Sequence, residues 1–282
     1  MPFSLDWGPH HLRLDERTHV MGVLNVTPDS FSDGGLFFET ERAIEHGISM
    51  VEEGADFIDI GGESTRPFSE PLSSEEEVSR VIPVIEAIAR EVSVPISIDT
   101  CKGSVAREAL RAGASIINDI SALRLDPEIA SVAAEAGVPV ILMHMKGTPE
   151  NMQKNPVYGD LIWEIKDFLK GAAQRAIKAG ISEDLILVDP GIGFGKTFDH
   201  NLQIIQNLSS FSSLGRPILI GTSNKAFIGK ILGKEAHERL TGTMATVAVT
   251  AMNGAHIVRV HNVKEAVETV KMVDAIKRGR VR

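Results

Sequence analysis

Short apolar runs rich in β-branched residues alternate with longer amphipathic stretches along almost the whole chain. Eight of the short runs predict buried strands, at residues 19–26, 57–62, 95–100, 115–120, 139–145, 185–190, 217–222 and 256–261. The longer stretches have the apolar spacing of helices, at 41–55, 75–92, 103–114, 127–137, 160–180, 198–211, 238–255 and 263–279. Several of them end in glycine, the residue that commonly terminates a helix.

This order predicts eight β-α units. Strands that alternate with helices pair in parallel through right-handed crossovers, and eight units in roughly 260 residues match a closed (β/α)8 TIM barrel. A doubly wound open sheet is the alternative, but its usual glycine-rich turn after the first strand is missing from the sequence. We expect a single α/β domain at 19–282, with residues 1–18 as a short N-terminal extension that caps the bottom of the barrel.

The composition indicates which classes of binding partner the protein has and in which cellular compartment it lies. The net charge of −9 argues against nucleic acid and anionic membranes as partners, because both need a basic face. The polar N-terminal residues do not resemble a signal peptide, and the longest uncharged run, 240–258, is too polar for a membrane span. The single cysteine, Cys101, rules out a disulfide framework and favours the cytoplasm.

Each predicted strand ends in polar side chains. In chain order they are Asn25, Asp59, Asp99, Asn118 with Asp119, His144, Asp189, Lys225, and Arg259 with His261. Arg259 and His261 are two residues apart, so they share one face of their strand. Because the active site of a TIM barrel lies at the carboxyl ends of its strands, these side chains would surround one opening.

Common phosphate, nucleophile and zinc motifs do not account for these residues. PGIGFGKT (190–197) resembles a P-loop but has Pro190 where the first glycine belongs, and GTSNK (221–225) lacks the final glycine of a nucleophile elbow. The sequence has no HExxH or paired-cysteine motif. Lys225 as the Schiff-base nucleophile of an aldolase stays open as an alternative.

Eight segments together match one known family in order and spacing. They are NVTPDSFSDGG (25–35), DIGGESTRP (59–67), SIDT (97–100), IINDIS (116–121), LMHMKG (142–147), DPGIGFGK (189–196), GTSNKAFIG (221–229) and RVH (259–261). In them the chain resembles the dihydropteroate synthases of folate biosynthesis, the targets of sulfonamides. The resemblance implies a transferase that joins 6-hydroxymethyl-7,8-dihydropterin diphosphate to p-aminobenzoate and releases diphosphate.

The resemblance also implies a pterin site and a diphosphate site. The pterin, whose donor edge suits carboxylates and amides, would be held by Asp99, Asn118, Met143, Asp189, Phe194 and Lys225. The diphosphate would be held by Asn25, Thr65, Arg259 and His261. The implied cofactor is Mg2+, with Asn25 as its protein ligand. One protein ligand is enough because this ion keeps most of its water ligands.

The same resemblance places p-aminobenzoate against Phe31, Thr65, Pro67, Ser223 and Lys225. Arg66 would belong to a lid formed by the loops after the first two barrel strands. The residues expected to carry catalysis are Asn25, Asp99, Asp189, Lys225, Arg259 and His261. We expect a dissociative reaction in which cations stabilise the departing diphosphate while Asp99 and Asp189 face the positive charge that develops on the pterin.

One residue departs from the family, and three questions stay open. Many members have an arginine before the lysine that follows the seventh predicted strand, Lys225. This chain has Asn224 there, so we expect altered binding of pterin or p-aminobenzoate.

The family suggests a homodimer. A methyltetrahydrofolate:corrinoid methyltransferase, which has no use for a diphosphate pocket, and a non-catalytic pterin-binding paralogue are the alternative functions.

Overall fold

The computed structural model describes residues 3–27, 35–64 and 72–280, of which 35–39 only as backbone. Two short antiparallel strands come first, β1 (Ser4–Trp7) and β2 (His10–Arg13). The strands that follow are β3 (His19–Asn25), β4 (Phe57–Gly61), β5 (Ile96–Asp99), β6 (Ile116–Asp119), β7 (Val140–Met143), β8 (Ile186–Asp189), β9 (Leu219–Ile220) and β10 (Ile257–Val260). The α-helices are α1 (Gly35–Glu52), α2 (Ser74–Glu91), α3 (Gly103–Ala112), α4 (Glu128–Ala136), α5 (Leu161–Lys178), α6 (Phe198–Gln206), α7 (Ala226–Leu232), α8 (Leu240–Met252) and α9 (Val263–Arg278).

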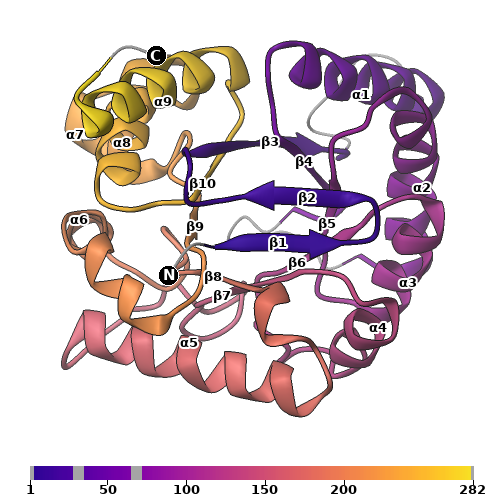
Figure 1. The fold of residues 1–282 in the computed structure, drawn as a ribbon, viewed down its shortest axis with the longest axis horizontal. Coiled ribbons are helices and arrows are strands. Elements are labelled where there is room, and N and C mark those ends of the chain that lie inside the picture. Colours follow the sequence, from indigo (N-terminus) through magenta and orange to yellow (C-terminus); the bar gives the residue numbers. More distant parts are fainter. Residues whose placement is uncertain (1–2, 28–34, 65–71, 281–282) are drawn as a thin grey trace.

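Strands β3 to β10 form a parallel barrel with the helices around it (Figure 1), which confirms the predicted TIM barrel. Their hydrogen-bonded order is β8-β7-β6-β5-β4-β3-β10-β9. The ring closes between β8 and β9 through a parallel bridge from Val188 to Ile218. There the N–H of Val188 donates to the carbonyl of Pro217 at 3.0 Å.

The apolar runs form strands because both of their faces are buried. Every residue of β6, β7 and β8 is buried, as expected of parallel strands covered by helices on one side and packed against the barrel interior on the other. The helices turn one apolar stripe inward. In α2 this stripe is Val81, Val84, Ile85 and Ile88, and a capping box between Ser73 and Glu76 starts the helix.

Two elements differ from the predicted helices. The spacing predicts one helix over 198–211, but α6 ends at Gln206 and a 3-10 helix follows at Leu208–Leu214. Ser210, Ser212 and Ser213 there each donate a hydroxyl hydrogen bond to the carbonyl three residues earlier, which competes with α-helical pairing. Helix α7 was not predicted, and its seven residues are too few to show a clear helical period.

The β1–β2 hairpin lies across the amino-terminal ends of the barrel strands, in front of them in Figure 1. The Phe3 ring packs edge-on against His256, the residue before β10, with ring centroids 5.0 Å apart. Strand β1 also contacts the 3-10 turn Glu183–Leu185, which comes directly before β8. Leu5 and Trp7 of this strand are buried. The assignment of 1–18 as a cap and 19–282 as the domain stays a prediction.

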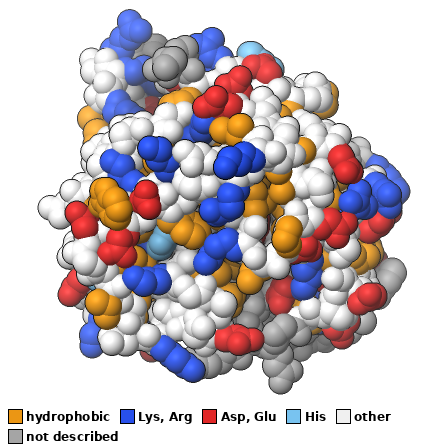
Figure 2. Space-filling model, turned by 90° about the horizontal axis from the view of Figure 1, so that it is seen from below, with side chains coloured by type: hydrophobic (Ala, Val, Ile, Leu, Met, Phe, Trp, Pro, Cys, Tyr) orange, Lys and Arg blue, Asp and Glu red, His pale blue; other side chains and the backbone are white. Residues whose placement is uncertain are grey.

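The outer surface has charges of both signs. Figure 2 shows the face that carries α5, where Lys, Arg, Asp and Glu side chains are interspersed with smaller apolar areas. Within the part of the chain that the structure describes, no helix is both long and apolar enough to cross a membrane.

Candidate active site

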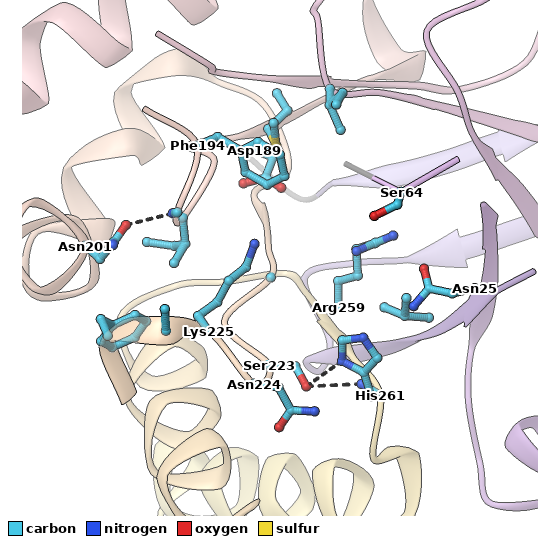
Figure 3. Close-up of a pocket in the computed structure, with 18 of the residues that line it drawn as sticks. Asn25, Ser64, Asp189, Phe194, Asn201, Ser223, Asn224, Lys225, Arg259 and His261 are labelled. Atoms are coloured by element: carbon cyan, nitrogen blue, oxygen red, sulfur yellow. Dashed lines mark hydrogen bonds between the residues drawn. The ribbon is translucent and has the colours of Figure 1, made fainter. Parts of the chain in front are cut away.

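A cavity of about 750 Å³ opens at the carboxyl ends of the barrel strands. Its lining includes every described residue to which the resemblance gives a role: Asn25, Asp99, Asn118, Met143, Asp189, Phe194, Ser223, Lys225, Arg259 and His261. Figure 3 labels seven of them, Asn25, Asp189, Phe194, Ser223, Lys225, Arg259 and His261. The other four residues with such a role, Phe31, Thr65, Arg66 and Pro67, lie outside the described residues. Asp59, Asp119 and His144, which the strand-end pattern also predicts around the opening, are buried and do not line the cavity. The individual roles assigned to these side chains stay predictions, whereas their gathering around one cavity is a property of the structure.

A chain of polar contacts crosses the floor of the cavity. Arg259 donates from Nε to Oδ2 of Asp59 at 2.6 Å and from Nη2 to Oδ2 of Asp99 at 2.7 Å. Asn118 donates from Nδ2 to the same Oδ2 of Asp59 at 2.9 Å. The side chains on β4, β5, β6 and β10 are thereby joined below the opening, so the arginine predicted to hold diphosphate contacts a carboxylate predicted to hold the pterin.

The two carboxylates predicted to hold the pterin have raised pKa values. Burial raises the pKa of Asp99 to about 7, although Arg259 opposes the shift. Burial likewise raises the pKa of Asp189 to about 6, against the hydrogen bond from the Gly191 N–H and the nearby lysines. Buried carboxylates of this kind favour a ligand that brings hydrogen-bond donors or positive charge.

Lys225 is the residue before α7, and its side chain projects into the cavity, as does that of Arg259 (Figure 3). The Lys225 Nζ lies 4.5 Å from the centre of the Phe194 ring, which is a cation–π arrangement. Burial and the charge of Arg259 together lower the pKa of Lys225 to about 8, although Asp189 and Asp99 oppose the shift. The ammonium and the ring together form one wall on which a flat ligand can pack.

The Asn25 amide, the His261 imidazole and the Arg259 guanidinium lie together on another side of the cavity (Figure 3). Asn25 ends β3, and His261 follows β10. The backbone N–H of His261 donates to the Ser223 hydroxyl at 3.3 Å, and His261 Nδ1 lies 2.9 Å from the same oxygen. Arg259 and His261 both line the cavity, as their two-residue spacing predicts. An amide, an imidazole and a guanidinium so arranged suit a phosphorylated ligand.

The PGIGFGK segment does not work as a phosphate loop, because its lysine turns into the protein. Lys196 is 2% exposed. Its Nζ lies 2.9 Å from Nδ1 of His144 and donates to the carbonyls of His144 at 3.2 Å and Phe194 at 2.9 Å. Burial lowers the pKa of Lys196, and burial together with this lysine lowers the pKa of His144.

Glycine allows this segment to pass close to β7. Gly191 has a φ of +71°, and a side chain there would collide with the carbonyl of His144. The N–H of Gly193 donates to Oδ1 of the buried Asn201 at 2.8 Å (Figure 3). The loop that carries Phe194 is therefore fixed from both sides.

Four residues that shape the site had no ligand or catalytic role in the sequence predictions. They are Asp59, Lys196, Asn201 and Arg239. Asp59 had a detectable signal, since it is the charged residue of the otherwise apolar strand β4 and belongs to the strand-end pattern. Arg239 donates from Nη1 to the carbonyl of Asn224 at 2.9 Å and had no signal, because it precedes α8 in an exposed stretch.

Among the described residues, no group of three or more His, Cys, Asp and Glu side chains could hold a metal ion. Mg2+ at a phosphate site needs only one or two oxygens from the protein, because water and the phosphate supply the other ligands. The side-chain oxygen of Asn25, which lines the cavity, can be one of them.

Comparison with known proteins places this geometry in a family. The family model described as "Pterin binding enzyme" matches residues 21–261. Dihydropteroate synthase of Bacillus subtilis is 51% identical over 268 residues, which cover 95% of this chain and 92% of that protein. A solved structure of the Yersinia pestis synthase with a sulfonamide drug complex has a TM-score of 0.93 and 44% identity, and covers 98% of this chain and 100% of that one. The Xanthomonas albilineans synthase with 4-aminobenzoic acid has a TM-score of 0.92 and 43% identity, at 98% and 99% coverage. The chain therefore belongs to the dihydropteroate synthase family of pterin-binding transferases.

Proposed function

We propose that the cavity joins 6-hydroxymethyl-7,8-dihydropterin diphosphate to p-aminobenzoate, with diphosphate as the leaving group. The observation that carries this proposal is the meeting of Asp99, Asp189, Lys225 and Arg259 in one cavity. Carboxylates suit the donor edge of a pterin, and the cations suit its diphosphate. Relatives that share over 40% of the sequence have been solved with 4-aminobenzoic acid and with a sulfonamide, which supports the second substrate.

We place the pterin deepest, against Asn118 and Asp189, with its ring on Phe194 and Met143. The bond between the exocyclic methylene carbon and the diphosphate oxygen breaks first, and its electron pair leaves with the diphosphate. Arg259 and His261 stabilise the departing anion, while Asp99 and Asp189 stabilise the cation that spreads over the pterin ring. The amine nitrogen of p-aminobenzoate then attacks the methylene carbon and gives up one proton to solvent.

Mg2+ is part of the proposal, with Asn25 as its protein ligand. When bound, the ion neutralises charge on the diphosphate. Loss of Asn25 should therefore weaken diphosphate binding more than pterin binding. Titration of inorganic diphosphate into an Asn25→Ala variant, with and without Mg2+, measures this directly, since no turnover is needed.

The activity is tested with purified protein, the pterin diphosphate, p-aminobenzoate and Mg2+. Dihydropteroate formation and diphosphate release should match, stop on addition of EDTA and return with Mg2+. Diphosphate release without p-aminobenzoate supports the dissociative order. Pterin binding without turnover would contradict the proposal and favour a binding paralogue or a methyltransferase, for which methyl transfer to a corrinoid is the next assay.

We propose that the protein is a homodimer, because three neighbouring helices expose apolar side chains that could form the interface. Those that are 45% exposed or more are Ile231 on α7, Leu232 on α7, Val249 on α8, Met252 on α8, Met272 on α9 and Ile276 on α9. Neighbouring exposed apolar residues mark interaction surfaces. Light scattering should give twice the 30.5 kDa chain mass. Ile231→Glu with Met272→Glu should give monomers, whereas Trp163→Glu, a control on α5, should stay dimeric.

We also propose a cytoplasmic location, on sequence grounds. Cys101 is free in the structure and is the chain's single cysteine, so no disulfide protects the fold. Fractionation of source cells, followed by immunodetection, should find the protein with cytoplasmic markers.

A further inference from the structure

Asp59 is a buried carboxylate beneath the cavity that no proposed step uses. It lies in the middle of β4 and has no exposed surface. Its Oδ2 accepts two hydrogen bonds, from Nδ2 of Asn118 at 2.9 Å and from Nε of Arg259 at 2.6 Å. Its Oδ1 has no hydrogen-bond partner among the described residues. Asp59 itself does not line the cavity, whereas both of its partners do.

The contact with Asp59 decides which way the Asn118 amide faces. A carboxylate oxygen can only accept, and it already accepts from a guanidinium, which can only donate. The Asn118 amide must therefore turn its NH2 group toward Asp59, because the opposite orientation would press two acceptor oxygens together at 2.9 Å. This places the amide oxygen of Asn118 on the side away from Asp59.

The amide oxygen of Asn118 is the group that a pterin needs at this position. Asn118 is a buried residue in the cavity lining, and no described residue donates to its Oδ1. A pterin has an amino group and a ring N–H along one edge, so it calls for acceptors. With its NH2 group turned to the cavity instead, Asn118 would face those donors with donors of its own.

We infer that Asp59 is a positioning residue for pterin recognition, which acts through Asn118 and never touches the substrate. Its hydrogen bond from Asn118 turns the amide oxygen of that residue toward the pterin. Its hydrogen bond from Arg259 holds the guanidinium at the bottom of the cavity. The inference rests on the proposed function, because it takes the pterin as the ligand that Asn118 recognises.

The Asp59→Ala variant tests the inference by removing the acceptor that both partners share. Without Oδ2 the Asn118 amide can face the cavity with its oxygen or its NH2 group, so its orientation is no longer fixed. Titration calorimetry with 6-hydroxymethylpterin should show a Kd about 10- to 100-fold above that of the wild type. The KM for the pterin diphosphate should rise with it, whereas the KM for p-aminobenzoate should change little.

Asp119→Ala is the matched control. Asp119 is equally buried at the end of the neighbouring β6, but it accepts from the backbone N–H groups of Ser121 at 2.7 Å and Leu123 at 2.6 Å. Its loss should lower the melting temperature while the pterin Kd stays within about twofold of the wild type. Equal weakening in both variants would show a general loosening of the barrel and would overturn the inference.

The amide variant gives the sharper result. Because Arg259 can only donate, Asp59→Asn should keep its amide oxygen at the Oδ2 position, where it still accepts from Arg259 and from Asn118. This variant should therefore bind the pterin within a few-fold of the wild type, although it has lost the charge. Unchanged affinity in Asp59→Ala, or equal weakening in Asp59→Asn and Asp59→Ala, would overturn the inference.

Failure of the inference and failure of the proposed function are separable. Binding of 6-hydroxymethylpterin requires no catalysis, so the three variants can be compared even if the wild type makes no dihydropteroate. An inactive wild type would count against the proposed function alone. An active wild type with an unaffected Asp59→Ala variant would count against the role of Asp59 alone.

Discussion

Arg259 donates from Nη2 to Oδ2 of Asp99 at 2.7 Å, so a predicted diphosphate ligand and a predicted pterin ligand are joined in the structure. A pterin that donates to Asp99 competes with the guanidinium for the same carboxylate. The protonation state of Asp99 should therefore affect the binding of both the pterin and the diphosphate part of the first substrate.

The activity should have a bell-shaped pH profile. A protonated carboxyl group has lost part of its acceptor capacity and the negative charge that stabilises the pterin cation, so kcat/KM for the pterin diphosphate should fall as the pH drops through the pKa values of Asp99, about 7, and Asp189, about 6. It should also fall above about 8, where Lys225 loses its proton. Lys225→Arg should move the alkaline limb upward and leave the acid limb in place. A profile that is flat across this range would contradict the assignment.

Asn224→Arg should alter binding without loss of chemistry. Asn224 has a φ of +56°, which asparagine tolerates and arginine does not, so the variant should lose about 1 kcal/mol of unfolding free energy. The added cation at the cavity rim should lower the KM for p-aminobenzoate about two- to fivefold. Asn224→Gly, which keeps the backbone angle and adds no charge, is the control. Two unchanged Michaelis constants in the arginine variant would refute the effect.

Lys196→Met should affect the pterin site and the fold together. The change leaves His144 Nδ1 and the carbonyls of His144 and Phe194 without their donor, at a cost of about 1–3 kcal/mol in unfolding free energy. Because Phe194 loses its backbone support, the KM for the pterin diphosphate should rise more than that for p-aminobenzoate. Urea unfolding and steady-state kinetics measure both effects, and Lys170→Met, at an exposed site on α5, should change neither.

A sulfonamide should compete with p-aminobenzoate. The solved Yersinia pestis relative holds a sulfonamide drug complex, and the described part of the predicted p-aminobenzoate site, Ser223 and Lys225, lines the cavity here. The drug should raise the apparent KM for p-aminobenzoate and leave kcat unchanged at saturation. Inhibition that saturating p-aminobenzoate fails to relieve would place the drug elsewhere.

The fold and most of the described site follow from the sequence because they depend on local patterns. A strand such as β8 shows its apolar run and its terminal Asp189 within a few residues, and barrel topology brings the strand ends together. Asp59 could not be assigned a role in this way, because its partners Asn118 and Arg259 lie 59 and 200 residues further along the chain. The direction of Lys196 was equally hidden, since it depends on close packing against His144.

The hairpin at residues 4–13 has a kinetic consequence. It lies across the amino-terminal ends of the strands, so within the described part of the chain ligands reach the cavity from the carboxyl side. The side chains proposed for the pterin include the deeply buried Asn118 and Asp189, and a second substrate nearer the opening stands in the path of the first. With the substrates placed as proposed, we expect a compulsory order in which the pterin diphosphate binds first, and excess p-aminobenzoate should inhibit because it occupies the entrance too early.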